Sequence, residues 1–100
     1  MDLIYLDNAA TTPIFPEVVD AMSQIMKTHY GNPSSVHANG RAAKAKVESA
    51  RKYIANLLGT LPQEITFTSG GTESDNTVLL CAVHRLGIKH IISSPIEHHA

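Results

Sequence analysis

Cysteine is almost absent from this 100-residue sequence, which contains Cys81 alone. A single cysteine cannot form an internal disulfide bond, which argues against a disulfide-stabilised secreted domain. No apolar run approaches the ~20 residues that a membrane-spanning helix needs. Residues 1–5 also lack the basic and apolar regions of a signal peptide. We therefore expect a cytoplasmic protein with no membrane partner.

An excess of charge of either sign is also lacking, because the net charge is −1 and the basic residues are scattered. Nucleic-acid binding usually requires a basic patch, so no nucleic-acid partner is expected. The hydrophobic content of 43% is typical of a globular protein rather than a disordered tail. A chain of this length forms at most one small domain.

Metal-binding patterns are missing as well, although the sequence has six histidines. Cys81 and His84 would lie one helical turn apart, and His98 is followed by a second histidine, but neither spacing matches a zinc site. We expect no metal site and place His84 and His90 on the surface. Cys81 lies in an apolar helical run, where a cysteine usually packs as a small hydrophobe.

Three segments have apolar residues at helical spacing. The first helix is predicted to begin at Pro16 and to end before Gly31. The second is predicted to be capped by Asn39 and to end at Gly59. An exposed Glu48–Lys52 pair is expected on it. Its predicted buried face consists of Ala43, Val47, Ala50, Ile54, Leu57 and Leu58.

The third helix is predicted over residues 72–86, with Gly87 closing it. It is apolar around most of its circumference, so burial on more than one side is expected. Residues 3–6 are predicted to be a short apolar extended segment, and the apolar segments at residues 65–68 and 89–93 are predicted strands. A strand, a helix and a strand of these lengths fit a crossover in a parallel or mixed sheet. A stable sheet needs more strands, so we expect part of a longer α/β protein.

The turn at residues 66–76 is the strongest local signal of a binding site. Gly70 and Gly71 allow a tight turn, and Thr72 has the chemistry of an N-cap, with Asp75 as a weak capping-box partner. The first N–H groups of such a helix, together with its dipole, can hold a phosphate. The segment is neither a nucleoside-triphosphate loop nor Gly-x-Gly-x-x-Gly. On these residues alone, a phosphate site and an empty capped turn remain equally open.

His98 follows the last predicted strand. Ligand sites in open α/β sheets lie beyond the carboxyl ends of the strands, where the glycine turn would also lie. A flat imidazole near an anion site suits a phosphorylated aromatic cofactor, because the ring can stack on it. The alternative for His98 is a solvated loop histidine.

Four motifs together resemble the cysteine desulfurase family and cover the whole sequence in the family's order. They are residues 5–13 (Tyr-Leu-Asp-Asn-Ala-Ala-Thr-Thr-Pro), 30–37 (Tyr-Gly-Asn-Pro-Ser-Ser-Val-His), 67–76 (Phe-Thr-Ser-Gly-Gly-Thr-Glu-Ser-Asp-Asn) and 97–100 (Glu-His-His-Ala). Members of this family are several times longer, so the resemblance implies an N-terminal part only. It implies the class-V aminotransferase branch of the fold type I pyridoxal-phosphate enzymes, which are homodimers.

The resemblance also implies how the chain is organised. Residues 1–15 would contribute to a small domain, and residues 16–100 would begin a large domain with a mostly parallel sheet between helices. Gly71 and Thr72 would hold the phosphate of pyridoxal 5'-phosphate, and His98 would stack on its ring and assist proton transfer. Residues 8–11 and His37 would lie near the mouth of the active site.

The implied reaction removes sulfur from L-cysteine and leaves alanine and a persulfide on an enzyme cysteine. No lysine here has the family's Ser-x-His-Lys setting, and Cys81 does not match the persulfide cysteine, so this chain alone would be inactive. The sulfur acceptor stays open between iron–sulfur cluster assembly, tRNA thiolation and other pathways. Two alternative functions remain: a selenocysteine lyase or other class-V enzyme on the same scaffold, and a non-catalytic phosphate-binding module.

Overall fold

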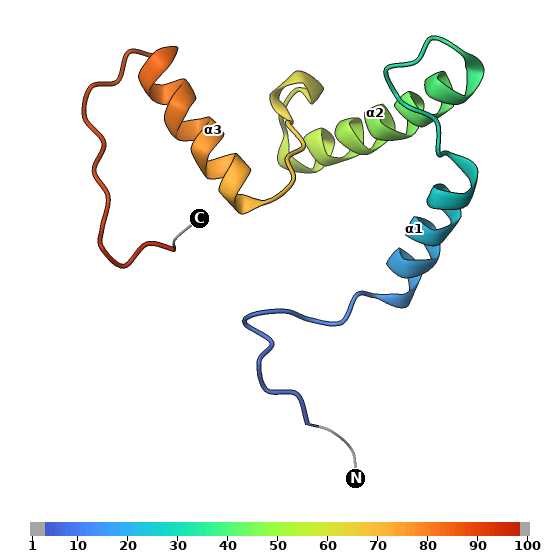
Figure 1. Ribbon diagram of the computed structural model, residues 1–100, viewed down its shortest axis with the longest axis horizontal. Helices are drawn as coiled ribbons and strands as arrows, with labels where there is room; N and C mark the ends of the chain where they lie inside the picture. Colours follow the sequence, from blue (N-terminus) through green and yellow to red (C-terminus); the bar gives the residue numbers. More distant parts are fainter. Residues whose placement is uncertain (1–3, 99–100) are drawn as a thin grey trace.

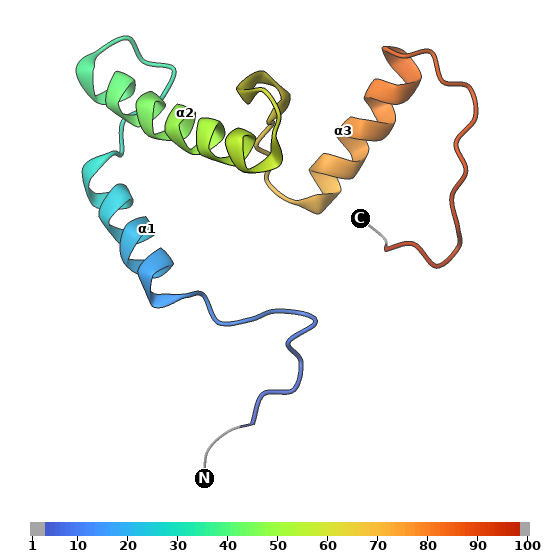
Figure 2. The same cartoon turned by 180° about the vertical axis from the view of Figure 1, so that it is seen from behind.

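The computed structural model describes residues 4–98 as a series of helices joined by extended segments (Figure 1). The elements are α1 (Pro16–Thr28), α2 (Ala38–Leu58), the 3-10 helix η1 (Pro62–Glu64) and α3 (Gly71–His84). They follow one another in an open arrangement of 53 × 47 × 25 Å rather than stacking in layers (Figures 1 and 2). Among these elements, α2 and η1 are the one pair in contact.

The ends of the helices follow the proline and glycine signals of the sequence. The start of α1 at Pro16 is confirmed, since the fixed φ of proline suits the first helical turn. The end of α2 at Gly59 is also confirmed. Gly59 has a φ of 65° and its N–H group bonds to the carbonyls of Ala55 and Asn56. The last helix, α3, ends at His84, two residues before the predicted end, and Gly87 follows with a φ of 68°.

The predicted cap of α2 is wrong. His37, not Asn39, is the N-cap, and its Nδ1 accepts a hydrogen bond from the N–H group of Gly40 at 3.3 Å. The helix starts earlier because Asn32 folds the preceding loop. Its side-chain oxygen accepts from the Ser34 N–H group and its carbonyl from the Ser35 N–H group, both at 2.9 Å.

Two glycines allow this loop to lie directly on the first turn of α2. A Cβ at Gly40 would come within 2.4 Å of the Ser35 carbonyl oxygen and 2.7 Å of the Asn32 carbonyl oxygen. A Cβ at Gly31 would come within 2.5 Å of the Asn39 carbonyl oxygen. Because both approaches involve backbone atoms, neither position has room for a methyl group.

Of the predicted buried face of α2, only the burial of Ala43 is confirmed, and the predicted burial of α3 is not found. Of the apolar residues described in the structure, only Ala43 and Ala55 are buried. Leu57 and Leu58 on α2 are 70% and 69% exposed, and α3 has no buried residue. Cys81 is exposed, so its predicted packing is wrong, whereas the surface positions of His84 and His90 are confirmed. These faces stay open because no other described element packs against them.

No strand occurs in residues 4–98, so the predicted sheet is not confirmed there. Ile65 has strand-like dihedral angles of −94° and 121°, but a strand also needs a hydrogen-bonded neighbour. The predicted strand at 65–68 follows η1, which contacts α2. The predicted strand at 89–93 turns back beside α3, so the two predicted strands are not adjacent (Figure 1). Leu3, the first residue of the predicted extended segment 3–6, lies outside the described residues.

None of the helices in the described part of the chain combines the length and the apolar character that crossing a bilayer requires.

Replacing Gly40 with alanine should destabilise the protein. Helix propensity alone favours alanine by about 1 kcal/mol. The contacts with the Ser35 and Asn32 carbonyls oppose this gain, because overpacking against backbone costs about 1–3 kcal/mol. We expect a lower free energy of unfolding for Gly40→Ala in urea titrations. Asn39→Ala, in the same turn but exposed, should change it by less than about 0.5 kcal/mol. A Gly40→Ala protein as stable as the parent would contradict the steric argument.

Candidate phosphate-binding turn

The glycine turn leads from Phe67 into α3 and leaves open space at its surface. Gly70 is the N-cap, with an extended backbone, and Gly71 is the first helical residue. A Cβ built at either glycine would meet no heavy atom within 4 Å. The glycines are therefore not required by close packing within the described chain, and a ligand can approach the backbone there.

Side chains before and after the glycines hold the turn. The carboxylate of Glu73 accepts from the N–H group of Ser69 at 2.7 Å and from its hydroxyl at 2.6 Å. The hydroxyls of Thr68 and Ser74 are 2.7 Å apart, and that of Ser74 donates to the Gly70 carbonyl at 3.1 Å. These bonds connect the entering segment to the first turn of α3.

The predicted N-cap at Thr72 is wrong, and so is its capping box with Asp75. Thr72 is the second residue of α3, and Gly70 occupies the N-cap without a side-chain bond. Thr72 is exposed, and its carbonyl accepts from the side-chain amide of Asn76 at 2.8 Å. The pairing of Ser69 with Glu73 was missed, although a glutamate in the first turn of a helix is a recognisable signal.

The electrostatics of this helix start favour an anion. The N–H groups of Gly71 and Thr72 have no acceptor within the helix, since the first four donors of any helix lack one. The helix dipole adds partial positive charge at the same place. Hydrogen bonds from the hydroxyl and then the N–H group of Ser69 lower the pKa of Glu73 below its usual value. Its carboxylate uses Ser69 and leaves the donors of Gly71 and Thr72 available.

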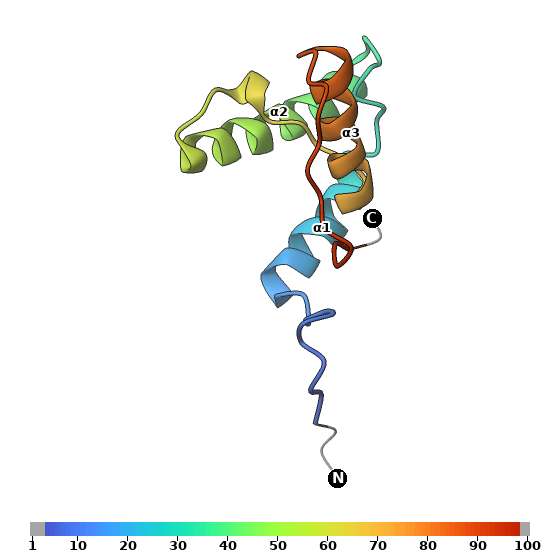
Figure 3. The ribbon, with the colours of Figure 1, turned by 90° about the vertical axis from the view of Figure 1, so that its left-hand side faces the viewer.

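His98 lies in a surface hollow beside the first turns of α3. The segment after α3 turns back along the helix, as Figures 1 and 3 show. His98, Glu97 and Ile92 line the hollow from this segment, and Asp75 and Leu79 line it from the helix. Its volume of about 490 Å³ lies within the ~300–1,000 Å³ typical of small-molecule sites. His98 is thus brought to the helix that Gly71 and Thr72 begin.

The other predicted site residues are not brought to this turn. His37 caps the far end of α2 and binds Gly40. Asp7 accepts backbone bonds from Ala10 and Thr11 at 3.1 and 3.4 Å, which folds residues 8–11 into a separate turn before α1. In Figure 1 the start of α2 lies at the opposite end of that helix from α3, and the segment before α1 does not reach α3. Within residues 4–98, no group of three or more His, Cys, Asp or Glu side chains is arranged to hold a metal ion.

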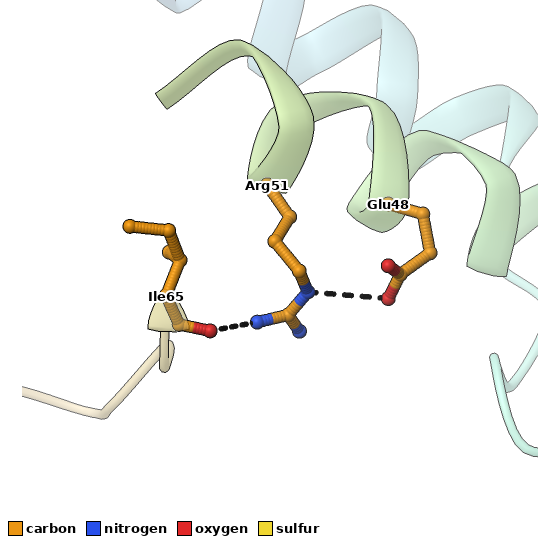
Figure 4. A network of polar contacts seen from close by, with 3 residues as sticks. All are labelled: Glu48, Arg51 and Ile65. Atoms are coloured by element: carbon orange, nitrogen blue, oxygen red, sulfur yellow. Dashed lines mark hydrogen bonds and ion pairs between the residues drawn. The ribbon is translucent and has the colours of Figure 1, made fainter. Parts of the chain in front are cut away.

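Arg51 was not singled out in the sequence, yet it contacts the segment that enters the turn (Figure 4). It donates to the Ile65 carbonyl, and its guanidinium carbon lies 4.9 Å from the centre of the Phe67 ring. Glu48 pairs with Arg51 at 3.3 Å, so the predicted Glu48–Lys52 pair is wrong. This contact is hard to predict from the sequence, because 14 residues separate Arg51 from Ile65.

The family of the chain follows from its similarity to known proteins. Residues 4–100 match the sequence model of the Aminotransferase class-V family, and the chain belongs to that family. No solved structure matches the chain.

The individual relatives include cysteine desulfurases and a selenocysteine lyase. The chain is 48% identical over 99 residues to "Cysteine desulfurase IscS" of Dictyoglomus turgidum, a match that covers 97% of the chain and 25% of that protein. It is 50% identical over 99 residues to "Cysteine desulfurase IscS" of Methanosarcina thermophila, covering 97% and 24%. It is 39% identical over 114 residues to "Selenocysteine lyase" of Bos taurus, covering 95% and 26%. The chain thus spans about a quarter of the length of these relatives.

The pairing of Ser69 with Glu73 predicts a pH dependence of the turn. Because the pKa of Glu73 is lowered in the folded state, its bonds stabilise the turn fully above the unfolded-state pKa. This stability is lost as the pH falls through the lower, folded-state pKa. We expect the NMR shift of the Ser69 amide proton to titrate with a midpoint below the usual glutamate value. Glu73→Gln should abolish the titration, whereas a midpoint at or above the usual value would contradict the pairing.

Proposed function

We propose that this chain is the N-terminal portion of a pyridoxal-phosphate-dependent cysteine desulfurase that converts L-cysteine to L-alanine and an enzyme-bound persulfide. The observation that carries the proposal is the 48% and 50% identity to two cysteine desulfurases over 97% of the chain. A small phosphate-binding module sharing only the glycine turn would not give similarity over this length. The homodimer, the cytoplasmic location and the protein acceptor of sulfur belong to the same proposal.

In this proposal, residues 1–15 contribute to a small domain beside the active site. Residues 16–100 begin a large cofactor-binding domain of fold type I, with a mostly parallel sheet between helices. The membership in the Aminotransferase class-V family supports this architecture. The exposed apolar residues of α2 and α3 support it as well, because helices in such a domain pack their apolar faces against a sheet.

Gly71 and Thr72 hold the cofactor phosphate in this proposal. The space beside both glycines, the donors at the start of α3 and the exposed side chain of Thr72 fit a phosphate group. Glycine at position 71 lets the backbone approach the phosphate closely. The carboxylate of Glu73 binds the N–H group of Ser69 and so holds the turn.

His98 stacks on the cofactor ring in this proposal and is placed to hold or pass a proton. Its position in the hollow beside Asp75 and Leu79 supports this role, because it brings the imidazole to the helix that Gly71 and Thr72 begin. When bound, pyridoxal phosphate supplies an electron sink for the amino-acid substrate. No lysine of this chain is assigned to the bond with the cofactor, and Cys81 is not assigned to the persulfide.

The complete reading frame that contains this chain should purify with bound pyridoxal phosphate. The visible absorption band of the bound cofactor should be present and should be lost on borohydride reduction. Addition of L-cysteine should yield alanine and, with a thiol reductant, sulfide. A folded protein that is colourless and does not take up added pyridoxal phosphate would overturn the proposal.

The site assignment needs its own test. Thr72→Ala should raise the dissociation constant of pyridoxal phosphate by about tenfold, the equilibrium factor of roughly 1.4 kcal/mol, because one phosphate hydrogen bond is lost. His98→Ala should shift the absorption spectrum of the bound cofactor. Thr77→Ala, exposed on the same helix, and His84→Ala, exposed at its end, are matched controls that should leave affinity and spectrum unchanged. Unchanged affinity in Thr72→Ala and an unchanged spectrum in His98→Ala would refute the assignment.

A selenocysteine lyase is the second candidate, because the 39% identity to the bovine enzyme covers 95% of the chain. The two functions differ in the atom that is released from the substrate. Parallel assays with L-cysteine and L-selenocysteine should give higher kcat/KM for L-cysteine if the first proposal is right. Activity confined to L-selenocysteine would replace it with the second.

A further inference from the structure

Arg51 connects α2 to the segment that enters the glycine turn, and Figure 4 shows its contacts. Its Nη1 donates to the Ile65 carbonyl, and its Nε lies 3.3 Å from a carboxylate oxygen of Glu48. The guanidinium carbon also lies 4.9 Å from the centre of the Phe67 ring, within the range of a cation–π contact. The side chain is 23% exposed, so water screens these contacts only in part.

The chain returns to Arg51 through a closed turn after α2. The Glu64 carboxylate accepts from the Thr60 hydroxyl and from the Leu61 N–H group, the latter at 2.8 Å. These bonds lower the pKa of Glu64, that of Thr60 contributing most. The turn brings η1 against α2 and leaves Ile65 within reach of the guanidinium.

The segment at residues 65–68 leads from Arg51 into the glycine turn. Phe67 meets Arg51, and the hydroxyl of the next residue, Thr68, lies 2.7 Å from that of Ser74 in α3. Neighbouring side chains of an extended segment point to opposite sides. The contact of Phe67 therefore holds the segment to α2, and the contact of Thr68 holds it to α3. Arg51 and Thr68 therefore define where the helix start lies relative to α2.

We propose that Arg51 is a positioning residue for the cofactor phosphate: it fixes Ile65 and Phe67 against α2 and thereby holds Gly71 and Thr72 in the geometry that binds the phosphate. This rests on the proposed function, since it takes Gly71 and Thr72 as the phosphate site. Arg51 has no contact with either residue and acts only through the segment.

The geometry of the guanidinium, rather than its charge, is the essential property. One planar group meets a carbonyl, a carboxylate and an aromatic ring at the same time. A lysine ammonium keeps the charge but lacks the planar, forked donor set that Arg51 uses here. Lysine at position 51 should therefore not restore the site.

The test uses the complete reading frame with pyridoxal phosphate as the probe. Cofactor dissociation constants are measured for Arg51→Met, Arg51→Lys and Lys52→Met, with the unfolding temperature of each cofactor-free protein. Lys52→Met is the matched control, because it removes one positive charge from the neighbouring, exposed position. Phosphorus NMR of the bound cofactor reports the surroundings of the phosphate independently of activity.

We expect Arg51→Met and Arg51→Lys to raise the dissociation constant by about tenfold, the equilibrium factor of roughly 1.4 kcal/mol. Both should shift the phosphorus resonance, while Lys52→Met leaves both quantities unchanged. The proposal is overturned if Arg51→Lys binds the cofactor like the parent, because charge alone would then suffice. It is also overturned if Arg51→Met binds like the parent, or if Lys52→Met weakens binding equally.

A variant of the aromatic partner separates positioning from general loss of stability. Phe67→Leu removes the ring, and its effect on the dissociation constant should be less than additive with that of Arg51→Met, because both remove one interaction. Full additivity would overturn the proposal. Failure of the parent protein to bind pyridoxal phosphate would instead refute the proposed function.

Discussion

The contact between the Arg51 guanidinium and the segment at Ile65 and Phe67 is the interaction on which the arrangement of the described chain depends. The other hydrogen bonds described above for the helices and turns join residues close in sequence. Arg51 reaches across 14 residues and sets the direction in which the chain leaves α2. A partly shielded ionic group suits this task, because its hydrogen bonds to a carbonyl and a carboxylate are stronger than those between neutral groups.

The starts of α2 and α3 are held by two different kinds of interaction. At the start of α2, close packing is used: Gly31 and Gly40 let backbone meet backbone, and the imidazole of His37 completes the first turn. At the start of α3, packing is absent and polar side chains hold the turn, with Glu73 on Ser69 and Ser74 on Thr68. The first kind of interaction leaves no room for an added atom, and the second leaves its backbone donors accessible. This contrast fits a structural role for the loop before α2 and a binding role for the turn before α3.

The sequence predicted those features that depend on one residue and its neighbours. Pro16 and Gly59 were right because a ring-fixed φ and a positive φ act locally. The predicted N-caps at Asn39 and Thr72 were wrong. The starts of these helices depend on side-chain bonds of His37 and Glu73, which follow from how the adjoining loop folds. The contacts of Arg51 were missed because they join distant segments, and the predicted strands lack a neighbour among the described residues. Of the candidate site, the turn was predicted from its own residues and His98 from its place after a predicted strand, and their roles stay predictions. The groups that hold the turn were not predicted.

The empty space beside Gly70 and Gly71 has a consequence for how substitutions there are understood. Nothing within the described chain opposes a methyl group at either position. Under the proposed function, a side chain at Gly71 would therefore meet the cofactor phosphate before any atom of the described chain. At Gly40 a substitution measures the chain's own packing, whereas at Gly71, under the proposed function, it would measure the room left for the cofactor phosphate.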